Sequence, residues 1–153
     1  MITNRAAVKV MGDLYTITGE GEPTTATVGT LGDIYVDIDE DSLTFGNSYV
    51  LTAISEGSYT WTRDMTYDTK IDYAIMRAHR DYLRIRGKPF DESGYPDGAE
   101  IVAAEMACYV AGIYEGRGVD SEGVADRSKG YEKKVAGYPA SIVAQIDKFV
   151  GVA

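Results

Sequence analysis

The chain has 153 residues and a mass of 16.6 kDa, enough for one medium-sized domain or two small ones packed together. Its 24 acidic and 15 basic residues give a formal net charge of −9, whereas a protein that wraps nucleic acid needs a surplus of Lys and Arg. A single Cys and a single His exclude an internal disulfide framework, a cysteine-based zinc site and a His-cluster metal site. Residues 1–5 lack the layout of a signal peptide, and the longest mostly apolar run, residues 106–114, is too short to span a membrane. We therefore expect a soluble, acidic protein of a reducing compartment with no membrane partner.

The aromatic composition is unusual, because Tyr supplies 12 of the 16 aromatic residues. Tyr combines a large ring with a hydroxyl that tolerates water, which suits a surface that a partner covers. Tyr is also a good strand residue in its own right. The composition alone leaves both explanations open.

The chain divides near residue 67 into an antiparallel β module, residues 1–66, and a helical domain, residues 67–153. The first part is rich in short alternating stretches of Val, Thr, Gly and Tyr, and it holds three basic and ten acidic residues. The second part has Ala, Ile, Met and Arg at helical spacing, with twelve basic and fourteen acidic residues. We expect an α+β fold, with a small antiparallel sheet followed by about three helices and an irregular Gly-rich loop.

The strands of the first part are predicted from alternation of apolar and polar residues. Residues 34–38 alternate in this way, and residues 49–54 are the expected antiparallel partner across a polar turn at 39–42. A turn at 56–58 leads into a strand at 59–61, with the hydroxyl-rich side of the sheet exposed. Further short strands are predicted at three places, which are residues 7–10, 14–18 and 24–27.

The second part opens with an amphipathic helix. Thr69 and Asp72 fit a capping box. An apolar stripe then follows at helical spacing, made of Ile71, Ile75, Ala78, Tyr82 and Ile85, and Gly87 ends the helix. The opposite side carries Arg77, Arg80, Arg84 and Arg86, which could contact DNA phosphates but which near Asp72 and Asp81 more often form salt bridges.

A second helix is expected after the cap residue Asp97, ending at residues 116–118. It is apolar nearly all round and rich in small residues, so it must be buried either by the chain's own fold or by a neighbouring subunit. Its Ala104 and Ala111 are therefore candidate subunit contacts. Pro139 opens a third helix whose apolar stripe is Ile142, Val143, Ile146, Phe149 and Val150.

No constellation of residues points to catalysis, a cofactor or a metal. Asp37, Asp39 and Asp41 have the spacing of the first ligands of an EF-hand loop, but Ser42 and Ser48 stand where that loop needs Gly and Glu. A solvated acidic turn is favoured, with cation binding as the alternative. His79 is interpreted as a helix-surface residue and Cys108 as a buried structural thiol.

The helical part resembles the head–tail connector (adaptor, or head-completion) proteins of long-tailed DNA phages, over 87 of the 153 residues. After the two helices comes a stretch, residues 118–131, that is similar to the Gly-x-x-Ser-Glu-Ser-x-Gly-Asp-x-Ser-x-Ser-Tyr pattern of this family. The residues that match include Ser121, Asp126, Ser128 and Tyr131, whereas Gly123, Ala125 and Gly130 depart from the pattern. The closing Pro-x-x-Ile helix of the family corresponds to Pro139, Ile142 and Ile146. In the first part, residues 29–37 (Gly-x-x-Gly-Asp-x-Tyr core) are similar to a small β module of phage tail and fibre proteins.

This resemblance implies a non-enzymatic structural virion protein at the head–tail junction, assembled in the host cytoplasm. It implies a ring, twelve-fold in the family, that docks between the portal and the tail or a stopper protein. DNA would pass through its lumen without specific binding, and an acidic surface suits that task because it does not hold DNA. Candidate interface residues are Arg77, Arg84, Ala104, Ala111, Ser121, Asp126, Ser128, Tyr131 and Phe149. The alternative is a small binding module that recognises carbohydrate through Tyr35, Tyr49, Tyr59 and Trp61, and an enzyme ranks third.

Overall fold

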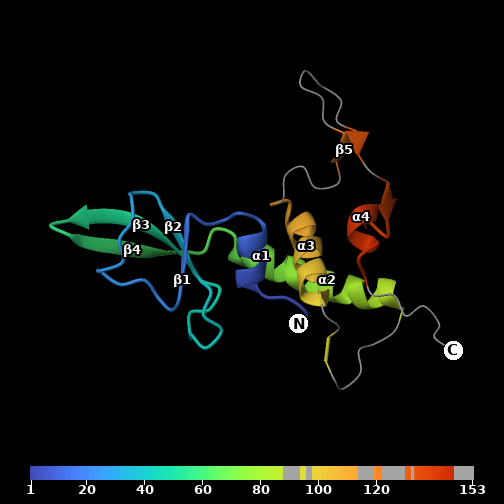
Figure 1. Ribbon diagram of the computed structural model, residues 1–153, viewed down its shortest axis with the longest axis horizontal. Coiled ribbons are helices and arrows are strands. Elements are labelled where there is room, and N and C mark those ends of the chain that lie inside the picture. Colours follow the sequence, from blue (N-terminus) through green and yellow to red (C-terminus); the bar gives the residue numbers. More distant parts are fainter. Residues whose placement is uncertain (88–93, 96–97, 114–118, 122–129, 132, 147–153) are drawn as a thin grey trace. The chain divides into compact units, whose positions relative to one another are not determined.

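The computed structural model describes residues 1–87, 94–95, 98–113, 119–121, 130–131 and 133–146, and its ribbon is drawn in Figure 1. The fold is α+β, as predicted, with a four-stranded sheet and several helices. In chain order the elements are α1 (Arg5–Met11), β1 (Ile17–Gly19), β2 (Ile34–Asp37), β3 (Ser48–Ser55), β4 (Ser58–Asp64), α2 (Asp68–Arg86), α3 (Ala99–Ala111), β5 (Val119–Ser121), β6 (Gly130–Tyr131), β7 (Lys134–Val135), β8 (Tyr138–Pro139) and α4 (Ala140–Val143). No described helix is both long enough and apolar enough to cross a membrane.

The chain forms two compact units, which are treated separately below. The amino-terminal unit is Asn4–Tyr73, and the carboxyl-terminal unit is Ala74–Ala153 together with Met1–Thr3. The division falls inside α2, so this helix contributes its first residues to one unit and the rest to the other. The boundary predicted at residues 66 and 67 lies just before α2.

The sheet of the amino-terminal unit has the strand order β1-β2-β3-β4. The predicted antiparallel pairing of residues 34–38 with 49–54 is confirmed, since Tyr35 lies opposite Tyr49 in β2 and β3. The hairpin between β3 and β4 is confirmed as well, and its turn residues Glu56 and Gly57 both have positive φ, 51° and 77°, as the favoured two-residue hairpin turns require. The sheet is not wholly antiparallel, however, because β1 runs parallel to β2.

One face of the β3–β4 hairpin exposes hydroxyl groups, as predicted. Thr52, Thr60 and Thr62 are exposed, and the hydroxyls of Thr52 and Thr62 lie 2.9 Å apart across the strands. The predicted alternation in β2 is wrong, because Asp37 is buried and Ile38 after it is exposed. Asp37 can be buried because its carboxylate accepts hydrogen bonds from the Gly21 and Asp39 amides and from the Thr44 hydroxyl.

Two predicted strands have other structures. Residues 7–10 lie in helix α1, which Asn4 caps by accepting a hydrogen bond from the Ala7 amide at 2.8 Å. Residues 24–27 form a turn in which the Thr27 amide donates to the Thr24 carbonyl and the Ala26 amide donates to the Thr24 hydroxyl. In both places a short polar side chain satisfies backbone groups locally, and this outweighs strand propensity. In place of the strand predicted at residues 14–18, the structure has the shorter strand β1, which begins at Ile17 and ends at Gly19.

The long helix α2 has its apolar stripe in the core. Ile71, Ala78 and Tyr82 are buried, and Gly87 ends the helix with a φ of 74°, as predicted. The predicted capping box is wrong, because α2 begins at Asp68 and Asp72 binds an arginine instead.

The carboxyl-terminal unit contains α3, which is buried along almost its whole length, from Val102 to Cys108 without interruption. Its end differs from the prediction, because Gly112 adopts a left-handed conformation (φ 68°) and stops the helix before residues 116–118. The predicted cap Asp97 lies outside the described residues. Helix α4 starts after Pro139 as predicted and buries Ile142 and Val143, but it ends at Val143. Ile146, after the helix, is buried as well, whereas residues 149 and 150 are not among those described.

Candidate functional site

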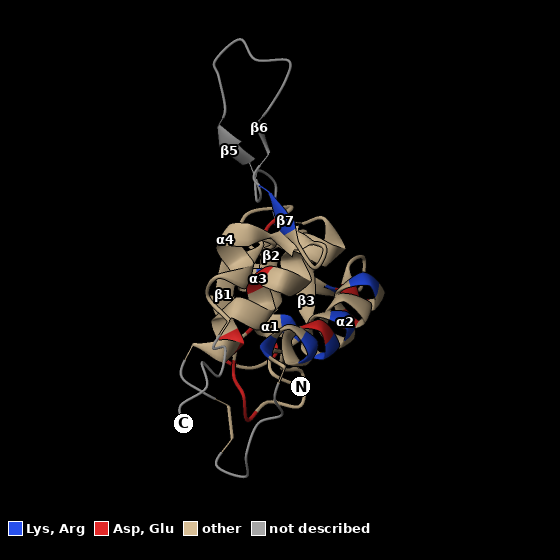
Figure 2. Ribbon diagram, turned by 90° about the vertical axis from the view of Figure 1, so that its right-hand side faces the viewer, with Lys and Arg blue, Asp and Glu red and all other residues tan. Residues whose placement is uncertain are grey.

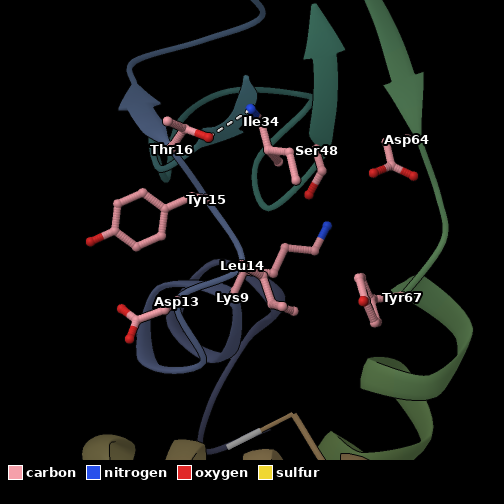
Figure 3. Close-up of a pocket in the computed structure, with 9 residues that line it drawn as sticks. All are labelled: Lys9, Asp13, Leu14, Tyr15, Thr16, Ile34, Ser48, Asp64 and Tyr67. Carbon is pink, nitrogen blue, oxygen red and sulfur yellow. Dashed lines mark hydrogen bonds between the residues drawn. The ribbon is translucent and has the colours of Figure 1, made fainter. Parts of the chain in front are cut away.

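A cavity of about 240 Å³ lies in the amino-terminal unit. Figure 3 shows that its lining comes from α1, the segment after α1, and the ends of three strands, with Tyr67 beside α2. The lining residues are Lys9, Asp13, Leu14, Tyr15, Thr16, Ile34, Ser48, Asp64 and Tyr67. The cavity therefore combines carboxylates, hydroxyls and one ammonium, which are groups that acid–base and nucleophilic catalysis use.

Lys9 is the most unusual residue of this cavity, because its side chain is almost fully buried. Its Nζ donates to the Gly46 carbonyl at 2.8 Å and to Asp68 Oδ1 at 2.7 Å. Burial lowers the pKa of Lys9, and the hydrogen bond and charge of Asp68 oppose that effect. Both partners accept hydrogen bonds and so favour the protonated ammonium, whereas an amine nucleophile has to be neutral. The arrangement is therefore that of a structural ion pair.

Asp68 is the centre of a buried charge network. Besides Lys9, Arg63 donates to its Oδ2, and Arg5 Nη1 lies 3.5 Å from the same oxygen. Burial acts to raise the pKa of Asp68, but the hydrogen bonds from Lys9 and Arg63 hold it below its usual range. Arg5 also clamps Asp72 with two hydrogen bonds, of 2.6 and 2.5 Å. The network ties α1 and β4 to the first turns of α2.

The acidic turn after β2 uses its carboxylates to order the backbone. Asp37 Oδ1 accepts from the amides of Gly21 and Asp39, both at 2.9 Å, and Oδ2 accepts from the Thr44 hydroxyl at 2.7 Å. Asp39 Oδ1 in turn accepts from the Asp41 amide. Burial acts to raise the pKa of Asp37, but hydrogen bonds to its carboxylate hold it below its usual range. In the described part of the chain, no group of three or more His, Cys, Asp or Glu side chains is arranged to hold a metal ion.

Two of the four aromatic residues proposed for carbohydrate binding lie in the core. Tyr35 and Tyr49 are buried, with Tyr35 packed against both Tyr49 and Trp61, and the Tyr35 hydroxyl donates to the Gly21 carbonyl at 2.8 Å. Trp61 is half-buried and donates to a backbone carbonyl. A sugar stacks on an exposed ring, so the predicted platform is wrong for Tyr35 and Tyr49.

The arginines of α2 gather around one buried carboxylate in the carboxyl-terminal unit. Arg77, Arg80 and Arg84 each lie 3.3 to 3.6 Å from an oxygen of Asp81, so the predicted salt bridges are present. Figure 2 marks the basic positions of α2 in blue and its acidic positions in red. Tyr138 donates to Asp81 Oδ2 at 2.6 Å, and burial together with this hydrogen bond raises the pKa of Tyr138 strongly. Arg77 and Arg84, both candidate interface residues, keep much of their side chains exposed.

The two candidate subunit contacts on α3 lie in the interior of the chain. Ala104 and Ala111 are buried within the chain itself, so the fold, and not a neighbouring copy, covers this helix. Cys108 is fully buried, as predicted. His79 is half-buried, and its Nδ1 accepts a hydrogen bond from the Ile2 amide at 3.2 Å. Burial lowers the pKa of His79.

The connector-like stretch is described only at its two ends. Ser121 and Tyr131 belong to β5 and β6, which pair in antiparallel fashion. The remaining candidate interface residues, Asp126, Ser128 and Phe149, lie outside the described residues.

Sequence reasoning missed the Lys9–Asp68 network and the fully exposed Leu43. Residues 7–10 are predicted as a strand, and alternation in a strand places a lysine between two valines on the opposite, solvent-facing side. The sequence therefore gives no signal that Lys9 is buried. Leu43, in contrast, follows four residues of which three are acidic, and an isolated apolar residue in such a loop is a usable signal.

No family model, curated protein or solved structure matches this chain.

Proposed function

We propose that this protein is a structural subunit of a phage head–tail connector, which forms a ring between the portal and the tail or a stopper protein and extends the DNA conduit. The observation that carries the proposal is the order of elements in the second half of the chain. An amphipathic helix, α2, is followed by the small-residue helix α3, by the paired strands β5 and β6, and by the Pro139-initiated helix α4.

The connector-like motif follows the two helices in the sequence, in the order that the family resemblance implies. Its described ends, Ser121 and Tyr131, stand in the paired strands β5 and β6. We assign Asp126 and Ser128 to the ring interface because they match the family pattern.

The charge of the molecule also supports a conduit. A net charge of −9 repels DNA at short range, and a lumen must let DNA slide without holding it. A strong net charge keeps free subunits apart in solution before assembly.

The test is to mix the purified full chain with portal rings of the same phage and to view the mixture by negative-stain microscopy. We expect an additional ring of density on the portal axis, absent from images of portal alone and of the chain alone. A chain that stays monomeric and never docks on the portal contradicts the proposal.

A further inference from the structure

The solvent side of α2 presents three arginines and a methionine on one face. Successive residues of a helix are rotated by about 100°, so Met76, Arg77, Arg80 and Arg84 lie within one third of the circumference. Met76 is 61% exposed, and the side chains of Arg80 and Arg84 are 72% and 65% exposed. We call these four residues the arginine face.

The arginine face carries an excess of positive charge. Its three guanidinium groups share the carboxylate of Asp81, which gives these four charged residues a net charge of +2. Asp81 is buried, and its Oδ2 already accepts the hydrogen bond of Tyr138. The outer edges of Arg80 and Arg84 are therefore available to an acidic partner.

A complementary surface exists on the amino-terminal unit, in residues 38–43, which we call the acidic loop. It has three acidic residues and no basic one, and Glu40 and Asp41 are exposed. Leu43 is fully exposed, and Ile38 at the other end of the loop is 41% exposed. Exposed apolar side chains beside charges are typical of protein contact surfaces.

The acidic loop is pre-organised for a contact. The Ser42 amide donates to the Asp39 carbonyl at 3.0 Å, and the Phe45 amide donates to the Ser42 carbonyl at 3.2 Å. At its base, the buried carboxylate of Asp37 holds the Asp39 amide and the Thr44 hydroxyl. A loop that is already ordered loses little conformational entropy when it binds.

We infer that the arginine face of one copy binds the acidic loop of a second copy, with Glu40 and Asp41 facing Arg80 and Arg84 and Leu43 packing on Met76. Charge and apolar groups are complementary in both surfaces. Two different patches meet in such a contact, and a head-to-tail contact of this kind closes into a ring when its rotation permits. The inference rests on the proposed function and specifies the subunit contact of the ring.

Duplex DNA is the competing occupant of the arginine face, and two observations disfavour it. The whole chain carries −9, so DNA is repelled by the rest of the molecule. Phosphate binding also leaves exposed Met76 and Leu43 without a role, whereas the proposed contact covers both.

The experiment is sedimentation velocity of the full chain over a range of concentrations, at low and at high salt. The variants are Glu40→Arg, Arg80→Glu and the double charge swap of both, with Lys70→Glu as a matched charge reversal at another exposed position of α2. Leu43→Ser is a further variant that leaves the fold intact, because Leu43 is fully exposed.

We expect salt-sensitive self-association of the wild-type chain, weakened at least about tenfold by each single reversal and by Leu43→Ser. The double swap should restore association to near the wild-type value, and Lys70→Glu should leave it unchanged. A wild-type chain that sediments as a monomer at every concentration overturns the contact, as does a double swap no better than the single variants. DNA binding that Arg80→Glu abolishes, without self-association, also overturns it.

The portal-docking assay separates this inference from the proposed function. If the chain docks on portal rings but the charge reversals leave its self-association unchanged, the contact is refuted and the connector role is not. Self-association that follows the predicted pattern, together with no docking on portal rings, refutes the connector role alone.

Discussion

Removal of the Asp68 carboxylate by Asp68→Asn tests the buried charge network most severely. The variant removes the negative charge from an ion pair of 2.7 Å and leaves the buried Lys9 ammonium with neutral acceptors, which are the Gly46 carbonyl and the amide oxygen of the new side chain. Removal of one partner of a buried ion pair costs about 3–5 kcal/mol, because the other charge stays buried without compensation. With a urea dependence of about 2 kcal/mol per molar, the unfolding midpoint should fall by about 2 M.

Two further variants sharpen this prediction, and all are measured by urea unfolding at neutral pH. Lys9→Met should cost less than Asp68→Asn, because Asp68 keeps its bond with Arg63. Asp72→Asn is the matched control, since this carboxylate pairs with Arg5 but its side chain is 46% exposed, against 9% for Asp68. An exposed pair contributes about 0–1 kcal/mol. Equal effects of Asp68→Asn and Asp72→Asn would refute the reasoning.

Three other predictions concern stability. Because the folded pKa of Asp68 lies below its unfolded value of about 3.9, its contribution is complete above that pH and is lost as the pH falls through the folded pKa, so wild-type stability should fall more steeply in acid than that of Asp68→Asn. Ala104→Leu should cost about 1–3 kcal/mol by overpacking the buried helix, whereas Ile101→Leu, on its exposed side, should be neutral in thermal unfolding. Tyr138→Phe should cost about 1–3 kcal/mol, because it removes the donor to buried Asp81; an unchanged melting temperature would contradict this.

The sequence correctly predicted two local features of the fold, an amphipathic helix and a hairpin turn. The stripe of Ile71, Ala78 and Tyr82 identified α2, and Glu56-Gly57 identified the β3–β4 turn. Both features are local, so neighbouring residues alone determine them.

Local side-chain hydrogen bonds explain the wrong strands at 7–10 and 24–27, whereas two errors of burial arose where partners elsewhere in the chain decide the structure. Lys9 is buried because Asp68 and the Gly46 carbonyl, far away in the chain, satisfy its ammonium. Asp37 is buried because the Gly21 amide, 16 residues away in the chain, and the Thr44 hydroxyl donate hydrogen bonds to its carboxylate. Alternation places polar residues outside, and it cannot identify a polar residue whose partners are supplied by tertiary structure.

The choice of Ala104 and Ala111 as candidate interface residues has a similar cause, because a sequence pattern does not identify what covers a buried helix. The small-residue pattern of α3 showed that the helix is buried, but not whether the chain itself or a second copy buries it. The structure assigns this burial to the chain itself at Ala104 and Ala111. Among the candidate residues described with their side chains, Arg77 and Arg84 are the exposed ones.

The most direct test of the account is a cryo-electron microscopy reconstruction of portal rings incubated with the purified chain. The account predicts a closed ring of copies on the portal axis, with an open central channel and with α2 of each copy at the subunit boundary. Particles in which the portal carries no added density, or in which single copies bind away from the axis, would contradict it.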